Sequence, residues 1–474
     1  MSTISQNQST PLPAREGQGG GSADLIIIGA GPGGYKAAVY AAKHGLKVTV
    51  FEDLYVGGTC LNVGCIPTKT YVHSKDFKEA VERQPQVVEA LRSGVETLLS
   101  HPNITLVREK GVFINANTVS GVTAPNIIVA TGSSAKMLPI PGADGQNVGS
   151  SSELLGLKEL PKRLCIIGAG VIGMEFASVF QKFGSEVTVV EYLKECLPMV
   201  DGDIAKRLRK LLEKRGITFY MGAGVKSIDG STVLFEQKGK EVAVEADYIL
   251  MATGRKANTE GLNLEAAGIA LAPNGTIPVD EHFKAKTLSN SSLKGEKTSE
   301  ENLPLKEEDT GQKVSPLRGD LEGSSIYAIG DVNGRQMLAH AAEMQGIHVV
   351  NQILGIEDKI RFDVMPAAIF TEPEAACVGP TEDQLKEQGV PFECHKSFYR
   401  ANGKALAMNE TEGMVKLCCE PEEGKLLSAH VFGAHAADIV QEVTAYITLG
   451  ATLRQLRETV HIHPTLSEVL IEVN

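Results

Sequence analysis

The first half of the sequence contains one pattern twice. Residues 27–52 align with residues 166–191 without a gap, at an offset of 139, and thirteen of the 26 aligned positions are identical. Each copy runs from an apolar segment into Gly-x-Gly-x-x-Gly, continues through an amphipathic stretch to a glycine, and ends with a β-branched segment that closes on a glutamate. This order predicts two βαβ units on parallel strands, and therefore an α/β protein with two Rossmann-like domains.

Each part of the repeated pattern suits a dinucleotide. The first glycine permits a tight turn, the second lets the backbone approach a pyrophosphate, and the third lets helix and strand pack closely. The helix N-terminus offers N–H groups to the phosphates, and the final glutamate can accept hydrogen bonds from a ribose diol. A glycine turn that binds nothing is the alternative, but two copies in register argue against it. The predicted binding residues are Gly29, Gly31, Pro32, Gly33, Gly34 and Glu52 in the first copy, and Gly168, Gly170, Val171, Ile172, Gly173 and Glu191 in the second.

The second site favours NAD over NADP, because the acidic Glu191 would repel a ribose 2′-phosphate. A shorter repeat supports the pairing of the two units. Ala130-Thr131-Gly132 recurs as Ala252-Thr253-Gly254, each time after an apolar strand. We expect these turns to close the two domains beside their cofactors, with Ala130, Thr131, Gly132 and Gly254 among the cofactor-binding residues.

Cys60 and Cys65 lie in a glycine-rich block, residues 57–69, directly after the first βαβ unit. Pro67 suits the first turn of a helix, which would place Cys65 near a positive helix end that favours thiolate. Half of a zinc site or two buried cysteines are the alternatives, and the other cysteines show no matching spacing for zinc. The block therefore predicts a dithiol/disulfide couple.

Composition excludes several other classes. Acidic residues outnumber basic ones by 58 to 46, the formal charge is −12, and no basic stripe suggests nucleic acid. No apolar run is long enough to span a membrane. Residues 1–23 are predicted to be a flexible polar tail without a secretion signal. We therefore expect a cytoplasmic protein, and we expect it to bind no metal. Cys418 and Cys419 lie in a strand-like run, where we expect them to be packing residues.

Residues 24–474 resemble the FAD-dependent pyridine nucleotide–disulfide oxidoreductases. The block Gly-Gly-Thr-Cys-Leu-Asn-Val-Gly-Cys-Ile-Pro-Thr-Lys at 57–69 carries most of this resemblance, together with the two glycine patterns. Further segments follow in the family's order, namely Ile329-Gly330-Asp331, Met337-Leu338-Ala339-His340, Phe370-Thr371-Glu372-Pro373, and His463-Pro464-Thr465 with Glu468.

The resemblance implies FAD and NAD as cofactors and assigns roles to individual residues. Cys60 and Cys65 would form the redox disulfide, His463 would be the base, and Glu468 would orient it. His463 would serve the cysteine pair of the other subunit, so the active unit would be a homodimer. Additional cofactor contacts are implied for Gly58, Thr59, Lys69, Gly111, Glu175, Asp331, Met337, Leu338, Ala339 and His340.

The same resemblance implies the domain order. An FAD-binding domain would comprise residues 24–150 and 278–363, an NAD-binding domain residues 151–277, and an α+β dimerisation domain residues 364–474. Within the family, the chain is similar to NAD-linked members that oxidise dihydrolipoyl groups on the lipoyl domains of 2-oxoacid dehydrogenase complexes. Another NAD(P)H-dependent disulfide reductase, or a non-catalytic FAD-binding subunit, remains the alternative.

Two departures from the family's pattern stand out. The stretch between Thr70 and Gly111 is shorter than usual, which puts the substrate channel in doubt. Residues 288–322 are inserted, polar and rich in Ser, Gly and Pro, and we expect a mobile surface loop or a hairpin without a catalytic role.

Overall fold

A computed structural model describes residues 21–287, 325–422 and 424–473. The insertion predicted at 288–322 and most of the predicted tail lie outside the described residues. Ser22 and Ala23, which the sequence placed in that tail, instead pair with Thr123. The chain divides into two compact units, one formed by Met1–Gly58, Gly94–Gly132 and Ala257–Asp358, the other by Thr59–Ser93, Ser133–Lys256 and Lys359–Asn474. The predicted domain boundaries stay a prediction.

The first unit is built on a parallel sheet with the order β18-β7-β1-β2-β3. The predicted central strand is confirmed as β1, and all four of its residues are buried, as is typical of a central strand in a parallel sheet. The strands are β1 (Leu25–Ile28), β2 (Val48–Phe51), β3 (Ile104–Val107), β7 (Asn126–Val129) and β18 (Ser325–Ala328).

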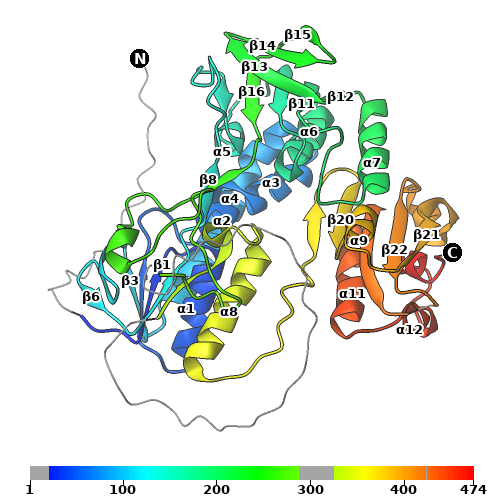
Figure 1. Cartoon of the computed structure of the whole chain (residues 1–474). Coiled ribbons are helices and arrows are strands. Elements are labelled where there is room, and N and C mark those ends of the chain that lie inside the picture. The colour runs from blue at the N-terminus through cyan, green and yellow to red at the C-terminus, as the bar shows by residue number, and fades with distance from the viewer. Residues whose placement is uncertain (1–20, 288–324, 423, 474) are drawn as a thin grey trace. The chain divides into compact units, whose positions relative to one another are not determined.

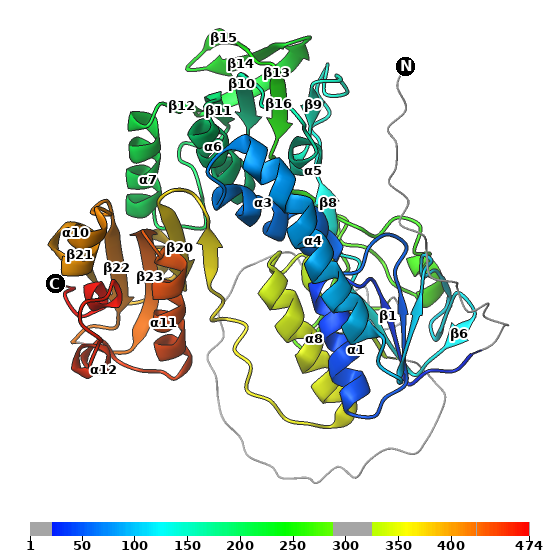
Figure 2. The ribbon, with the colours of Figure 1, turned by 180° about the vertical axis from the view of Figure 1, so that it is seen from behind.

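Two helices of this unit, α1 (Pro32–Lys43) and α8 (Ala339–Leu354), lie side by side (Figures 1 and 2). Their close approach depends on small residues, because a Cβ at Gly33 would come within 2.9 Å of the Ala342 carbonyl oxygen. The unit also contains the 3₁₀ turns η1 (Leu264–Ala267) and η2 (Gly330–Asn333), and a small antiparallel sheet of β4 (Phe113–Asn115), β5 (Thr118–Val119) and β6 (Val122–Thr123).

The second unit contains the second copy of the repeat. Its parallel sheet has the order β12-β11-β10-β16-β9, so the strand of the second glycine pattern is again central. Helix α6 (Val171–Phe183) ends as predicted at Gly184, which takes a left-handed conformation. The strands are β9 (Val148–Gly149), β10 (Arg163–Ile167), β11 (Glu186–Glu191), β12 (Thr218–Met221) and β16 (Tyr248–Met251), and the further helices are α5 (Ser151–Leu155) and α7 (Gly202–Lys214).

An antiparallel sheet adjoins this one, formed by β13 (Ala223–Asp229), β14 (Thr232–Gln237) and β15 (Lys240–Glu245). The redox block forms two short helices, α2 (Gly58–Val63) and α3 (Cys65–Val72). Most of the shortened stretch after it forms one long helix, α4 (Phe77–Leu99), of which residues 77–93 belong to this unit. The short strands β8 (Ser133–Ala135) and β17 (Arg255–Ala257) complete the set before residue 287. Within the described ranges, no helix combines the length and hydropathy that crossing a membrane requires.

The C-terminal part of the second unit is a sheet with the order β19-β20-β23-β22-β21, packed against α11 (Ala436–Thr448) and α12 (Leu453–Glu458) (Figure 1). Its strands are β19 (Ala367–Ile369), β20 (Glu374–Val378), β21 (Glu393–Phe398), β22 (Met414–Cys419) and β23 (Leu426–Gly433). Shorter elements are α9 (Glu382–Glu387), α10 (Gly403–Met408), η3 (Tyr399–Ala401) and η4 (Ser467–Leu470).

One prediction about the cysteines is wrong. Cys418 is not a mere packing residue, because it forms a disulfide with Cys394 across β21 and β22. Antiparallel register places the two residues directly opposite each other, with their Cα atoms 4.3 Å apart. Cys419 does pack as expected, on the opposite face of β22 in the core beneath α11 and α12.

Candidate active site

The glycine pattern of the first unit forms a cradle at the start of α1. Gly29 has a φ of +102°, and a Cβ there would approach the Ala130 carbonyl oxygen to 2.5 Å. At Gly31 the nearest atom to an added Cβ would be 3.9 Å away, so the backbone is open at the position that the pattern assigns to a pyrophosphate. No side chain caps the N-terminus of α1, so its N–H groups can bind an anion. These features fit FAD.

The second unit repeats this arrangement at α6. Gly168 has a φ of +107°, a Cβ at Gly170 would meet nothing within 4 Å, and no side chain caps the helix. Gly254, predicted to lie beside the cofactor, is equally open. The cradle therefore fits a second dinucleotide.

The two terminal glutamates are held in the same way. Glu52 accepts hydrogen bonds from the backbone N–H groups of Ala30 and Leu54 at 2.8 and 2.9 Å. Glu191 accepts from Ala169, and from Leu193 at 2.7 Å. Burial raises the pKa of Glu52, although its hydrogen bonds to the backbone oppose this. Both carboxylates are thus fixed at a strand end, where further lone pairs can accept from a ribose diol.

The remaining predicted cofactor residues of the first unit lie on three segments. Thr131 donates to the Asn258 carbonyl at 2.7 Å, and this fixes the turn of Ala130-Thr131-Gly132. Gly111 packs against Ile28 and Phe51, so its role there is close packing. Asp331 lies in η2, while Met337 and Leu338 precede α8 and Ala339 and His340 begin it.

Sequence reasoning missed Gln345, a fully buried residue of α8. Its Oε1 accepts from the Gly330 N–H at 2.8 Å and from the Asn333 side chain at 3.0 Å, which fixes the turn that carries Asp331. Its Nε2 has no hydrogen-bond partner among the described residues. A glutamine within a helical segment gives no sequence signal that its side chain fixes a neighbouring turn.

The redox block brings Cys60 and Cys65 together. Cys60 lies on α2, and Cys65 is the first residue of α3. Gly64 joins the helices in a tight turn, because a Cβ there would lie 2.9 Å from the Thr59 carbonyl oxygen. In this structure both cysteines are thiols. Residue Cys65 is exposed at the surface, although protein atoms around its sulfur partly exclude water, and Cys60 is half-buried.

The Cys65 thiol is activated. A hydrogen bond with Cys60 and the positive charge of Lys69 lower its pKa to about 7, against the opposing effects of burial and of the negative charge of Glu175. A substantial fraction of Cys65 is therefore thiolate near neutral pH, and the thiolate is the nucleophilic form.

Lys69 and Glu175 form an ion pair inside the second unit. Lys69 Nζ lies 2.9 and 3.0 Å from the two carboxylate oxygens, and the Glu175 side chain is only 5% exposed. Sequence reasoning identified Phe370 only as part of a segment that follows the family's order, yet it contacts both partners. Its N–H donates to Glu175 at 2.9 Å, and its ring centroid lies 4.4 Å from Lys69 Nζ. The pair is therefore fixed from three segments of the chain.

His463 and Glu468 lie together near the C-terminus. His463 Nδ1 is 2.9 Å from Glu468 Oε1, and Oε2 of the same carboxylate accepts from the Thr465 N–H at 2.8 Å. These hydrogen bonds lower the pKa of Glu468. The His463 side chain is 80% exposed, and its hydrogen bonding runs to Glu468 rather than to either redox cysteine of the same chain. With Nδ1 bound to a carboxylate, Nε2 is the nitrogen that can accept a proton.

Comparison with protein families finds two adjacent matches. The model described as "Pyridine nucleotide-disulphide oxidoreductase" matches residues 23–290, and its "dimerisation domain" matches residues 365–473. The first match alone spans more than half of the chain.

Similar proteins include dihydrolipoyl dehydrogenase 1, mitochondrial, of Arabidopsis thaliana, which is 35% identical over 95% of this chain and 89% of its own. Dihydrolipoyl dehydrogenase of Bacillus subtilis is also 35% identical, over 95% of each chain. Among solved structures, the HOCl-induced flavoprotein disulfide reductase RclA of Escherichia coli, in its Cu(II) complex, superposes with a TM-score of 0.81 at 30% identity, covering 95% of this chain and 99% of that one.

Proposed function

The chain belongs to the pyridine nucleotide-disulphide oxidoreductase family, and from this premise we propose that it oxidises dihydrolipoyl groups to the disulfide with NAD⁺ as acceptor. Family membership confirms the predicted fold class and makes the chain an oxidoreductase that uses FAD and NAD(H). The relatives that carry the name dihydrolipoyl dehydrogenase support the choice of substrate.

The observation that carries the proposal is the Cys60–Cys65 pair with its activated thiol. A thiol with a pKa of about 7 is suited to exchange with a dithiol near neutral pH, because it is both a good nucleophile and a good leaving group. In the Lys69–Glu175 pair beside it, the positive charge of Lys69 stabilises the thiolate and lowers the pKa of Cys65. The negative charge of Glu175 partly opposes this lowering.

We propose the following steps for the chain's own residues, starting from the oxidised Cys60–Cys65 pair. His463 accepts a proton from the substrate thiol, and Glu468 stabilises the resulting cation. The substrate thiolate attacks Cys60, which releases Cys65 as a thiolate. The second substrate thiol then attacks the substrate sulfur bound to Cys60, the lipoyl disulfide forms, and Cys60 leaves and takes up the proton that this thiol loses. FAD, held by the glycine turn at 29–34 and by Glu52, would supply the two-electron redox chemistry that links the Cys60–Cys65 dithiol to NAD⁺. Glu191 selects NAD⁺ by its charge.

The family's dimerisation domain supports a homodimer. We propose further that His463 serves the cysteine pair of the second copy, and that lipoyl domains of 2-oxoacid dehydrogenase complexes deliver the substrate. The exposure of His463 on its own chain supports the first proposal, because a second copy can reach an exposed ring. The predicted cytoplasmic location stays a prediction.

A second candidate is reduction of another disulfide with NAD(P)H. The similarity to RclA favours it, because that structure is described as a disulfide reductase and superposes over 95% of this chain. A non-catalytic FAD-binding subunit is less favoured, since such a protein has no need of an activated Cys65 or of the His463–Glu468 pair.

Steady-state assays with dihydrolipoamide and NAD⁺, and with NADPH and glutathione disulfide or other small disulfides, separate these functions. The proposal expects turnover in the first assay and its loss in Cys65→Ser, while the control Cys419→Ala, which removes a packing cysteine, retains it. Turnover only with NADPH and a disulfide would support the second candidate. No turnover in either assay by FAD-loaded protein would support the non-catalytic subunit.

A further inference from the structure

A row of four side chains crosses the C-terminal sheet on the face opposite α11 and α12. The strand register places Lys396, Lys416, His430 and Cys377 opposite one another on β21, β22, β23 and β20. Each of the four contacts the short segment 199–203 that leads into α7. We name this contact the Lys416 seam.

The seam is held by charge. Lys416 is 1% exposed, and its Nζ lies 2.8 Å from Asp201 Oδ1 and 3.5 Å from Asp203 Oδ2. Lys396 binds the same oxygen of Asp203 at 2.7 Å. His430 Nδ1 accepts from the Asp201 N–H at 3.2 Å, and Cys377 Sγ lies 3.7 Å from the Met199 carbonyl. The segment after Glu191 is therefore anchored on the C-terminal sheet.

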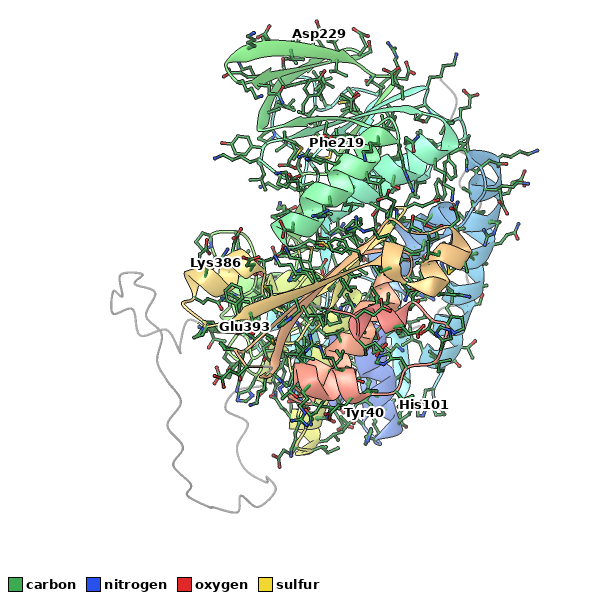
Figure 3. The ribbon with its side chains drawn as sticks, turned by 90° about the vertical axis from the view of Figure 1, so that its right-hand side faces the viewer. Tyr40, His101, Phe219, Asp229, Lys386 and Glu393 are labelled. Carbon is green, nitrogen blue, oxygen red and sulfur yellow. A yellow bond between two sulfur atoms is a disulfide. The ribbon has the colours of Figure 1, made fainter. Side chains whose placement is uncertain are left out.

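The Cys394–Cys418 disulfide lies in the next row of the same face. Cys394 and Cys418 are two residues from Lys396 and Lys416 on the same strands, so their side chains share a face with the seam. β21 is the edge strand of the sheet, and Figure 3 labels Glu393 at its start. The disulfide is thus a covalent link between this edge strand and β22.

The surroundings of the disulfide favour its opening by a thiol. Cys394 is half-buried on the edge strand, whereas Cys418 is fully buried, so a nucleophile reaches Cys394 first. Ser428 lies opposite Cys418 in register on β23, and its buried hydroxyl has no hydrogen-bond partner among the described residues. A hydroxyl at that place can donate to the Cys418 sulfur when it leaves as a thiolate.

We propose that Cys394 and Cys418 form a second redox-active pair, a thiol–disulfide exchange site for small dithiols, whose reduction loosens β21 and the Lys416 seam. One thiolate of the dithiol attacks Cys394 Sγ, the Cys394–Cys418 bond breaks, and Cys418 leaves as a thiolate that takes up a proton. The second thiol of the reagent then closes onto the first, leaves as a cyclic disulfide, and releases Cys394. The dithiol is oxidised and the protein disulfide reduced, so no other reactant is required.

Thiol mapping tests the chemistry. Full-length Cys60→Ser/Cys65→Ser protein is purified without reductant, denatured and alkylated, and we expect label only on Cys165, Cys196, Cys377 and Cys419. Treatment of the native protein with dithiothreitol before denaturation should add label at Cys394 and Cys418. The proposal is overturned if these two cysteines are labelled before any reductant, or if only denatured protein gains the two labels.

Proteolysis tests the consequence. We expect trypsin to cleave after Lys396 about fivefold faster in dithiothreitol-treated Cys60→Ser/Cys65→Ser protein than in untreated protein, because a released edge strand opens more often. The Cys394→Ser variant should behave like the reduced protein without any reductant, and Cys419→Ala should not. Equal cleavage in the oxidised and reduced proteins would contradict the loosening, and this comparison remains available if Cys394→Ser does not fold.

Discussion

The two cysteine pairs of this chain differ in almost every physical respect. Cys60 and Cys65 are close in sequence, lie at a helix start, and are thiols with one pKa lowered to about 7. Cys394 and Cys418 are 24 residues apart, lie on paired strands, and form a disulfide. The first environment stabilises a thiolate, whereas the second aligns two sulfurs through strand register. The comparison teaches that one chain can hold one cysteine pair with an activated thiol at a helix start and another pair that links two strands and, as proposed above, is opened by small dithiols.

The largest expected difference is in catalysis. Cys65→Ser should lower kcat with dihydrolipoamide and NAD⁺ on the order of a thousandfold, because no thiolate remains to complete the exchange. Cys394→Ser should change kcat by less than about twofold, since its sulfur lies in the C-terminal sheet and takes no part in the steps proposed for dihydrolipoyl oxidation. Steady-state kinetics of the two variants check this. A large loss of kcat in Cys394→Ser, in folded protein, would end the proposed division of roles.

The next effect concerns the Lys416 seam beside the second pair. Lys416→Met should lower the free energy of unfolding by about 3 kcal/mol, because it leaves the buried carboxylate of Asp201 without its cation. Lys396→Met is the matched control, and since Lys396 is more exposed we expect a loss of less than about 1 kcal/mol. Chemical denaturation of both variants measures the difference. Equal losses would show that burial of the charge is not what stabilises the seam.

A smaller effect concerns the cause of the lowered pKa of Cys65 in the first pair. Lys69→Met should raise the pKa of Cys65 by about one unit, because the nearby positive charge that favours the thiolate is lost. The thiolate fraction at pH 7 then falls, and alkylation by iodoacetamide becomes slower. The rate is followed against pH in a Cys60→Ser background, with and without the Lys69 substitution. An unchanged midpoint would mean that the charge of Lys69 does not contribute to the pKa of Cys65.

How far the sequence predicts these features depends on how local they are. The glycine patterns and the pair at Cys60 and Cys65 are formed by residues close in sequence, and the predicted strands and helices of both repeats are confirmed. The role of the terminal glutamates in binding a ribose stays a prediction. The disulfide of Cys418 depends on the register of two strands joined by a long connection, which no local pattern specifies. From the apolar run around Cys418 and Cys419, we therefore predicted that both cysteines only pack in the core. The prediction is right for Cys419 and wrong for Cys418.

The buried charges were missed for the same reason. No sequence pattern singles out Lys416, which is buried with its charge paired to Asp201, a residue 215 positions away in the chain. Phe370 likewise acts through a contact with a distant segment, whereas Gln345 fixes a turn that lies only 15 residues before it. Sequence patterns predicted the glycine cradles, while the contacts that fix the elements around them required the folded chain.

The smallest expected effect is the pH dependence of the seam. Burial lowers the pKa of His430, and its Nδ1 must be unprotonated to accept from the Asp201 N–H. The charges that face it are Asp201, which favours protonation, and Lys416, which opposes it. Below about pH 6.5 the unfolded chain binds a proton here that the folded chain does not, so this contribution is full above that pH and is lost as the pH falls. Melting temperatures are measured between pH 5 and 8, the range in which an ordinary histidine titrates. The melting temperature should fall less at low pH for His430→Gln than for the wild type, because glutamine cannot titrate. An identical fall would assign the acid sensitivity to other groups.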